Sequence, residues 1–335
     1  MSAIQKIGDS TYIFLDIKDN TLDDIDKASC SNKRLNNYHP PRYGLRILDR
    51  LPLEIIQMVL MRLDIRSLTD FRQVNRKARL VTDSIPQYRQ ILTHAPALFR
   101  RCLNIESARF FSCQELYNQL CTAECDSCGD FGGYLYLITC RRVCFLCFTE
   151  KVDYLPLLRK DLTIHFGLHS KNLTGLPCMR SFPGRYSPRG IKCQRRQILF
   201  DYSSARQAGV AVHGSIESME KYALQMASKR SNKNNSDLPY GRTGEIYVRR
   251  SRSECPVDGK CSNPRRFMSI ISAPYLGEQL ATAEWGVHCV ACKPHHYGRP
   301  LHWRRKYTIK GFQGHVRECG EIISGRHVCN QAEMR

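Results

Sequence analysis

The clearest pattern in the chain is a run of apolar residues at helical spacing between residues 48 and 95. Pro52 suits the first position of a helix, where no amide donor is needed. Apolar side chains then recur three or four residues apart, at Ile55, Ile56, Val59, Leu60 and Leu63. Asp64 and Asn75 are typical N-cap residues, and Pro86 follows the last apolar position, so we predict three short helices with these boundaries. A unit of roughly 40 residues buries little apolar surface by itself, so we expect an exposed apolar face that awaits a partner.

The other segments differ from this helical module in composition. The N-terminal part is polar and ends near Pro40 and Pro41, and the run from Ser228 to Glu245 is rich in turn residues. We expect an irregular segment at 1–44, the helical module at 45–105, a cysteine-rich middle domain at 106–225, a loop or linker at 226–250 and a Cys/His-rich, zinc-finger-like region at 251–335.

The 17 cysteines among 335 residues require a reason. The N-terminus lacks the apolar core of a secretory signal, and no apolar run approaches the roughly 20 residues that cross a bilayer. We therefore expect a soluble intracellular protein, in the cytoplasm or the nucleus, without contact with a membrane. Thiols stay reduced there, which favours metal ligation over disulfides.

A first metal site is predicted from two closely spaced cysteine pairs. Cys125 and Cys128 form one Cys-x2-Cys pair, Cys144 and Cys147 form another, and 15 residues separate the pairs. The β-type run at 134–138 between them fits a tetrahedral zinc site beside a hairpin. Four thiolates leave no open position for a catalytic water, so this zinc should be structural. Cys121 and Cys140 are alternative ligands.

A second zinc site is predicted near the C-terminus. Its candidate ligands are Cys289, Cys292, His315 and Cys319, with 22 residues between the two pairs. A helix beginning near Gly314 would place the last two ligands on one face. His295 and His296 are competing ligands, and a different arrangement would include Cys255, Cys261 or Cys329. The expected fold class is therefore mixed α+β, with a three-helix module followed by small α+β modules that zinc stabilises.

The net charge of +20 indicates attraction to acidic partners. Basic residues are spread along the whole chain, and the run Arg304-Arg305-Lys306 lies near the second predicted finger. A zinc-finger nucleic-acid-binding protein is therefore the alternative interpretation, with nucleic acid possible but not favoured.

An enzyme is not expected. The sequence contains no glycine-rich phosphate loop, nucleophile elbow or H-E-x-x-H motif. His165 and His169 are four residues apart, but such a pair is typical of a helix surface.

The helical module resembles the F-box family. The residues that carry this resemblance are Leu51-Pro52-x-Glu54-Ile55, Val59-Leu60, Leu63, Asp64-Ile65, Ser67-Leu68, Phe71-Arg72 and Val74-Asn75-Arg76. In that family the F-box docks on the small adaptor subunit of cullin-based ubiquitin ligases (SCF), and the rest of the chain selects the client protein. The resemblance implies that adaptor contacts, or support for them, come from Leu51, Pro52, Ile55, Ile56, Val59 and Leu60. It implies a client but does not identify it.

A wider resemblance involves the cysteine-rich part. The runs FGGYLYL, RRVCFLC and MRSFPGRYS, together with the late Cys-x2-Cys and His-x3-Cys pairs, resemble a group of cysteine-rich fungal F-box proteins. This resemblance implies no specific activity for the non-F-box half.

Overall fold

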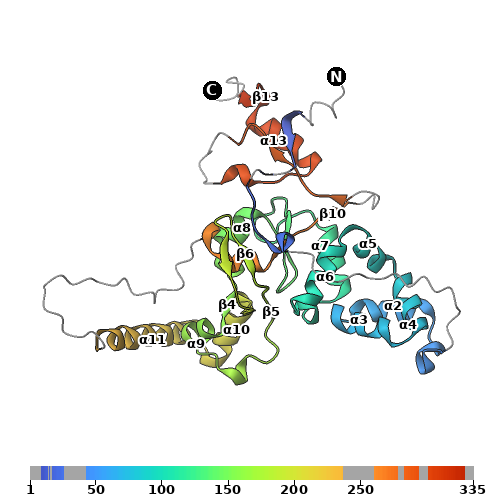
Figure 1. Cartoon of the computed structure of the whole chain (residues 1–335), viewed down its shortest axis with the longest axis horizontal. Coiled ribbons are helices and arrows are strands. Elements are labelled where there is room, and N and C mark those ends of the chain that lie inside the picture. The colour runs from blue at the N-terminus through green and yellow to red at the C-terminus, as the bar shows by residue number, and fades with distance from the viewer. Residues whose placement is uncertain are drawn as a thin grey trace.

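The computed structural model describes residues 9–13, 15, 17–25, 43–236, 260–277, 283–293 and 301–328, and it confirms a mixed α+β fold (Figure 1). Helices predominate in the first part of the chain, and small sheets follow. Within the described residues, no helix combines the length and the apolar character needed to span a membrane.

The three predicted N-terminal helices are confirmed. A short 3-10 helix, η2 (Arg46–Arg50), precedes α2 (Leu53–Arg62), α3 (Ile65–Val74) and α4 (Arg76–Ser84). Pro52 is the N-cap residue of α2 rather than its first residue. Asp64 accepts the amide of Ser67 at the start of α3, and Asn75 accepts the amide of Ala78 at the start of α4. Side-chain caps thus set both boundaries.

Further helices continue from this module into the middle of the chain. Proline opens both α5 (Pro86–His94) and α6 (Pro96–Asn104), and the 3-10 helix η3 (Ser107–Arg109) follows. Ser112 and Glu115 form a capping box at the start of α7 (Cys113–Cys121).

A three-stranded antiparallel sheet forms the centre of the molecule. Its strand order is β3-β2-β9, with β2 at Tyr134–Tyr136, β3 at Arg141–Val143 and β9 at Ile270–Ser272. The predicted β-type run at 134–138 is therefore a strand over its first three residues. Helix α8 (Phe145–Glu150) follows β3, and α12 (Pro264–Met268) precedes β9.

A side module lies beside this centre. It contains β4 (Leu157–Leu158), α9 (Arg159–Phe166), β5 (Cys178–Arg180), β8 (Ile198–Phe200), α10 (Tyr202–His213) and α11 (Ile216–Ser236), with 3-10 helices at Val152–Tyr154 and Ser170–Asn172. Between β5 and β8, strands β6 (Gly184–Tyr186) and β7 (Ile191–Cys193) form a hairpin. Helix α11 projects away from the body (Figure 1). It covers the first part of the segment 226–250, for which the sequence suggests a loop, and residues 237–250 lie outside the described residues.

The C-terminal module includes a piece of the N-terminus. Its elements are β12 (His288–Cys289), η7 (His302–Arg304), α13 (Ile309–Cys319), β13 (Glu321–Ile323) and β14 (Arg326–Val328), and β10 (Tyr275–Leu276) pairs with β11 (Ala283–Glu284) ahead of them. Strand β1 (Thr11–Tyr12) pairs antiparallel with β12, beside α13 in Figure 1. The chain then reaches the central sheet through η1 (Leu22–Asp24), where the Asp23 carboxylate accepts the amide of Ser272. The N-terminal segment at 1–44, expected to be irregular, thus supplies a strand and a 3-10 helix.

One hydrophobic core joins the helical module to the central sheet. Ile56, Leu60 and Leu68 belong to the same cluster of buried side chains as Leu135 of β2 and Ile271 of β9. Smaller clusters stabilise the side module and the C-terminal module. The helical module is therefore continuous with the rest of the protein in its packing.

A buried arginine fixes the central sheet to its surroundings. The Arg142 guanidinium donates to the carbonyl oxygens of Gln119, Gly132 and Pro274. Burial lowers the pKa of Arg142 to about 10. These three bonds link α7, the loop before β2 and the segment after β9.

Candidate functional site

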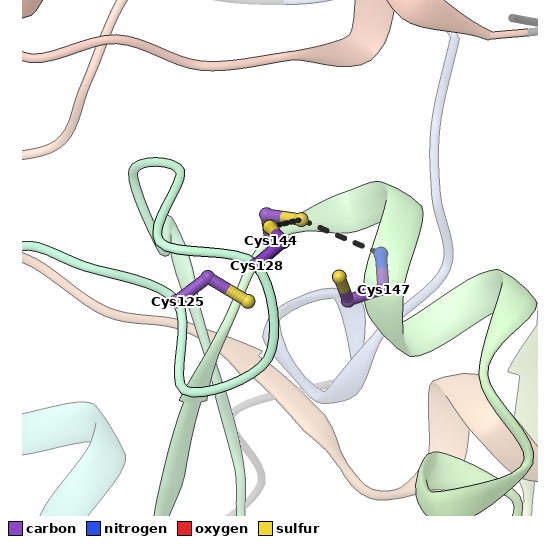
Figure 2. A group of neighbouring side chains, drawn as sticks. All are labelled: Cys125, Cys128, Cys144 and Cys147. Carbon is purple, nitrogen blue, oxygen red and sulfur yellow. Dashed lines mark hydrogen bonds between the residues drawn. The ribbon is translucent and has the colours of Figure 1, made fainter.

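The four cysteines of the first predicted metal site meet in the structure. Cys125, Cys128, Cys144 and Cys147 bring their sulfur atoms within 4.8 Å of one another. Figure 2 shows the four sulfurs turned toward a common space, two from a loop and two from the start of α8. The Sγ atoms of Cys128 and Cys144 are 3.6 Å apart. Sulfurs at about 2.3 Å from a tetrahedral zinc ion lie about 3.8 Å apart, so these residues fit zinc.

Local backbone geometry explains this convergence. The first pair lies on a tight turn in which the Gly129 amide donates to the Cys125 carbonyl over 3.0 Å. Gly129 has φ +78°, in the left-handed region that glycine tolerates best. On the other side, Cys144 is the N-cap of α8, and its sulfur accepts the amide of Cys147 over 3.4 Å. Helix geometry thus directs both thiols of the second pair toward the turn (Figure 2).

The thiols perturb one another strongly. Hydrogen bonds from Cys144 and then Cys147 hold the pKa of Cys125 far below its usual range. The hydrogen bond to Cys125 raises the pKa of Cys147 to about 12, and the same interaction raises the pKa of Cys144. Without a cation only one thiolate is stabilised. A dication is what would allow all four to ionise together.

A second group near the C-terminus contains Cys289, Cys292, His315 and His327, again within 4.8 Å of one another. Nε2 of His315 is 3.4 Å from Cys292 Sγ, and Nε2 of His327 is 3.3 Å from Cys289 Sγ. Nitrogen and sulfur ligands of one tetrahedral zinc ion are separated by about 3.5 Å, so this set also fits zinc.

The remaining ring nitrogens of the two histidines are also engaged. Nδ1 of His327 lies 2.9 Å from the Gly320 carbonyl, to which it donates. Nδ1 of His315 lies 3.5 Å from Cys319 Sγ. Such partners fix the tautomer of a histidine so that Nε2 presents its lone pair, which is typical of metal-binding histidines.

Cys319, a predicted ligand, is therefore not in the group of four. It contacts the Nδ1 side of His315, whereas the other members meet on the Nε2 side. The fourth position is taken by His327, which sequence reasoning missed. A detectable signal existed: the turn dipeptide Ser324-Gly325 separates Ile322-Ile323 from Arg326-His327-Val328, and two short segments joined by such a dipeptide can form a hairpin. In that hairpin His327 lies opposite Ile322, near the end of α13.

The alternative ligands lie elsewhere. Cys140 is buried in the turn between β2 and β3, Cys121 ends α7, and Cys261 lies in the 3-10 helix at Lys260–Ser262. None of them belongs to either group. Cys255, His295, His296 and Cys329 fall outside the described residues.

A short segment connects the two groups. The Arg305 side chain forms an ion pair with Asp130, which follows the turn that contains Cys128. The Arg305 carbonyl accepts a hydrogen bond from Nδ1 of His288, the residue before Cys289. Arg304 is buried, pairs with Asp19, and stacks 3.8 Å from the ring centroid of Phe145 in α8. The run Arg304-Arg305-Lys306 therefore makes internal contacts.

The helical module presents an apolar surface of the predicted kind. Of its six predicted adaptor residues, Leu51, Pro52, Ile55 and Val59 are exposed, Val59 by 53%. Ile56 and Leu60 are buried in the core and support the others from beneath. Further exposed apolar side chains of the module are Ile47, Leu48, Leu53, Met58, Val74 and Leu80. Val74 and Leu80 are exposed by 69% and 51%.

Comparison with known proteins identifies the domain to which this part of the chain belongs. Residues 48–90 match the family model of the F-box domain. The chain therefore contains an F-box domain at residues 48–90, and this domain implies a substrate-adaptor role in SCF-type ubiquitin ligases. No curated protein and no solved structure is significantly similar to the chain.

Proposed function

We propose that this protein is the substrate-receptor subunit of a cullin-type ubiquitin ligase, acting inside the cell, in the cytoplasm or the nucleus. Its F-box docks the adaptor subunit, which connects it to the cullin, and the remainder holds a client protein. The observation that carries the proposal is the match of residues 48–90 to the F-box domain. The exposed apolar face of α2 supports it.

The docking surface has a recognisable layout. Leu51 and Pro52 lie immediately before α2, and Ile55 and Val59 lie one helical turn apart on it. Their exposure leaves them available to a helical partner, for which apolar anchors dominate affinity. Ile56 and Leu60, on the adjacent face of α2, are buried in the core and hold the helix in place.

We further propose that both Cys/His groups hold structural zinc. The ligands are Cys125, Cys128, Cys144 and Cys147 in the first site, and Cys289, Cys292, His315 and His327 in the second. Four protein ligands complete each coordination sphere, so the ions stabilise the client-binding part and leave no position for a reacting water.

An assembly experiment tests the proposed function. The purified full chain is mixed with the cullin in the presence and absence of the adaptor, and the mixtures are separated by size-exclusion chromatography. We expect the chain to co-elute with the cullin only when the adaptor is present. Co-elution without the adaptor, or no co-elution at all, would contradict the proposal.

A further inference from the structure

The middle of the chain contains a long segment without acidic residues. Between Asp161 and Asp201 there is no Asp or Glu, whereas the basic residues are Lys171, Arg180, Arg185, Arg189, Lys192, Arg195 and Arg196. In the sequence these cations look like part of a general excess. The structure gathers five of them, from Arg185 to Arg196, on and immediately after the β6–β7 hairpin. We call residues 184–196 the basic hairpin.

The hairpin pairs like charges. Its register places Arg185 directly opposite Lys192, and both side chains are exposed. Like charges opposite each other across two strands are unfavourable. Arg189, Arg195 and Arg196 are also exposed. Within the described part of the chain, none of these five cations forms an ion pair with a carboxylate.

A buried tyrosine and two hydrogen bonds attach the basic hairpin to the rest of the protein. Tyr186 is fully buried and its hydroxyl donates to the Phe182 carbonyl over 2.8 Å. The Asn20 side chain, from the N-terminal segment, donates to the Ser187 carbonyl over 2.9 Å. The cations are thus displayed on a supported surface, which reduces the ordering cost of binding.

The composition of this surface selects anionic groups. Four of the five cations are arginines, whose planar guanidinium binds carboxylates and phosphates through two parallel hydrogen bonds. Single-stranded nucleic acid usually also needs free aromatic rings for stacking. Here Tyr186 is buried, and the Phe182 ring already contacts the guanidinium groups of Arg101 and Arg196 at 5.8 and 4.9 Å.

We propose that the basic hairpin binds an acidic segment of the client protein, through the carboxylates of Asp and Glu or through phosphoserine. This inference rests on the proposed role as a substrate receptor. It places client recognition on β6 and β7, on a surface separate from the F-box helices.

Fluorescence anisotropy with the full chain tests the proposal at about 0.15 M salt. The probes are three labelled 12-residue peptides of identical spacing, carrying glutamate, phosphoserine or glutamine, and an oligothymidine. The variant is R185Q/K192Q. The matched control is K171Q/R206Q, which removes the same charge from exposed positions in the 3-10 helix at Ser170–Asn172 and in α10. The hairpin variant loses charge-assisted hydrogen bonds to the peptide, so its affinity for the acidic peptides should fall by about tenfold or more. The affinity of the control variant should fall by less than about twofold.

Different outcomes separate this proposal from the proposed function. Binding of the glutamate or phosphoserine peptide that only the hairpin variant loses would support the proposal, and the tighter of the two peptides identifies the anionic group. Equal losses in both variants, no binding of either acidic peptide, or tighter hairpin-dependent binding of the oligothymidine would overturn it. Adaptor binding is measured in parallel, because R185Q/K192Q should retain it. If the wild type does not bind the adaptor, the F-box assignment is refuted instead.

Discussion

Replacing Cys144 with serine should release one metal ion and unfold the central part of the protein. Serine is a good N-cap residue, so the Cys144→Ser change preserves the start of α8 and removes mainly the metal-binding thiolate. The wild type should bind two equivalents of zinc, and this variant should bind one.

The expected loss of stability can be worked from α8. This helix carries Phe145, Leu146 and Phe148, all of them fully or almost fully buried. Each such side chain contributes about 1.5–3 kcal/mol when buried, so α8 anchors about 5–9 kcal/mol of apolar burial. A structural zinc site contributes about 10–16 kcal/mol of apparent binding free energy. Since a native domain is stable by only about 5–15 kcal/mol, loss of this site should remove the cooperative transition.

A buried cysteine outside both groups provides the matched control. Cys113 lies in α7, and burial raises the pKa of its thiol to about 12, so it is neutral. Cys113→Ser should cost about 1–3 kcal/mol for the buried hydroxyl and keep both zinc ions. Differential scanning calorimetry and elemental analysis measure both variants. If Cys144→Ser keeps two zinc equivalents, or lowers Tm no more than Cys113→Ser does, the reasoning about the first site is refuted.

Two further changes test other parts of the structure. His327→Ala should lose one zinc equivalent whereas Cys319→Ser should keep both, because only His327 presents a ligand atom to the second group; elemental analysis giving the reverse result would restore Cys319 as the ligand. Arg142→Met should lower the free energy of unfolding by about 3 kcal/mol or more, since three buried carbonyls lose their donor; urea denaturation showing a loss below about 1 kcal/mol would mean that these bonds contribute little.

The sequence predicted those features that depend on local patterns. Helical spacing and the caps Asp64 and Asn75 located the F-box helices, because these signals act within a few residues. The spacing of two Cys-x2-Cys pairs located the first group, because each pair closes its own turn and chain length limits how far apart they lie.

Features that depend on distant pairing were not predictable in this way. Strand β1 lies near the N-terminus and pairs with β12, which is far away in the sequence. Strand β9 likewise pairs with the distant strand β2. His327 enters the second group only because a hairpin folds back beside α13, so spacing alone favoured the nearer Cys319.

The F-box assignment is tested most directly by the affinity of the full chain for the adaptor. Isothermal titration calorimetry compares the wild type with Val59→Asp, and with Ile198→Asp on β8 as a control at another exposed apolar position. In the complex, an aspartate at position 59 would be buried against an apolar surface without a partner. Val59→Asp should therefore raise the Kd for the adaptor by about 100-fold or more, whereas Ile198→Asp should leave this Kd within about twofold of the wild-type value. If the wild type does not bind the adaptor, or if Val59→Asp binds as tightly as Ile198→Asp, residues 48–90 do not form an adaptor-docking surface.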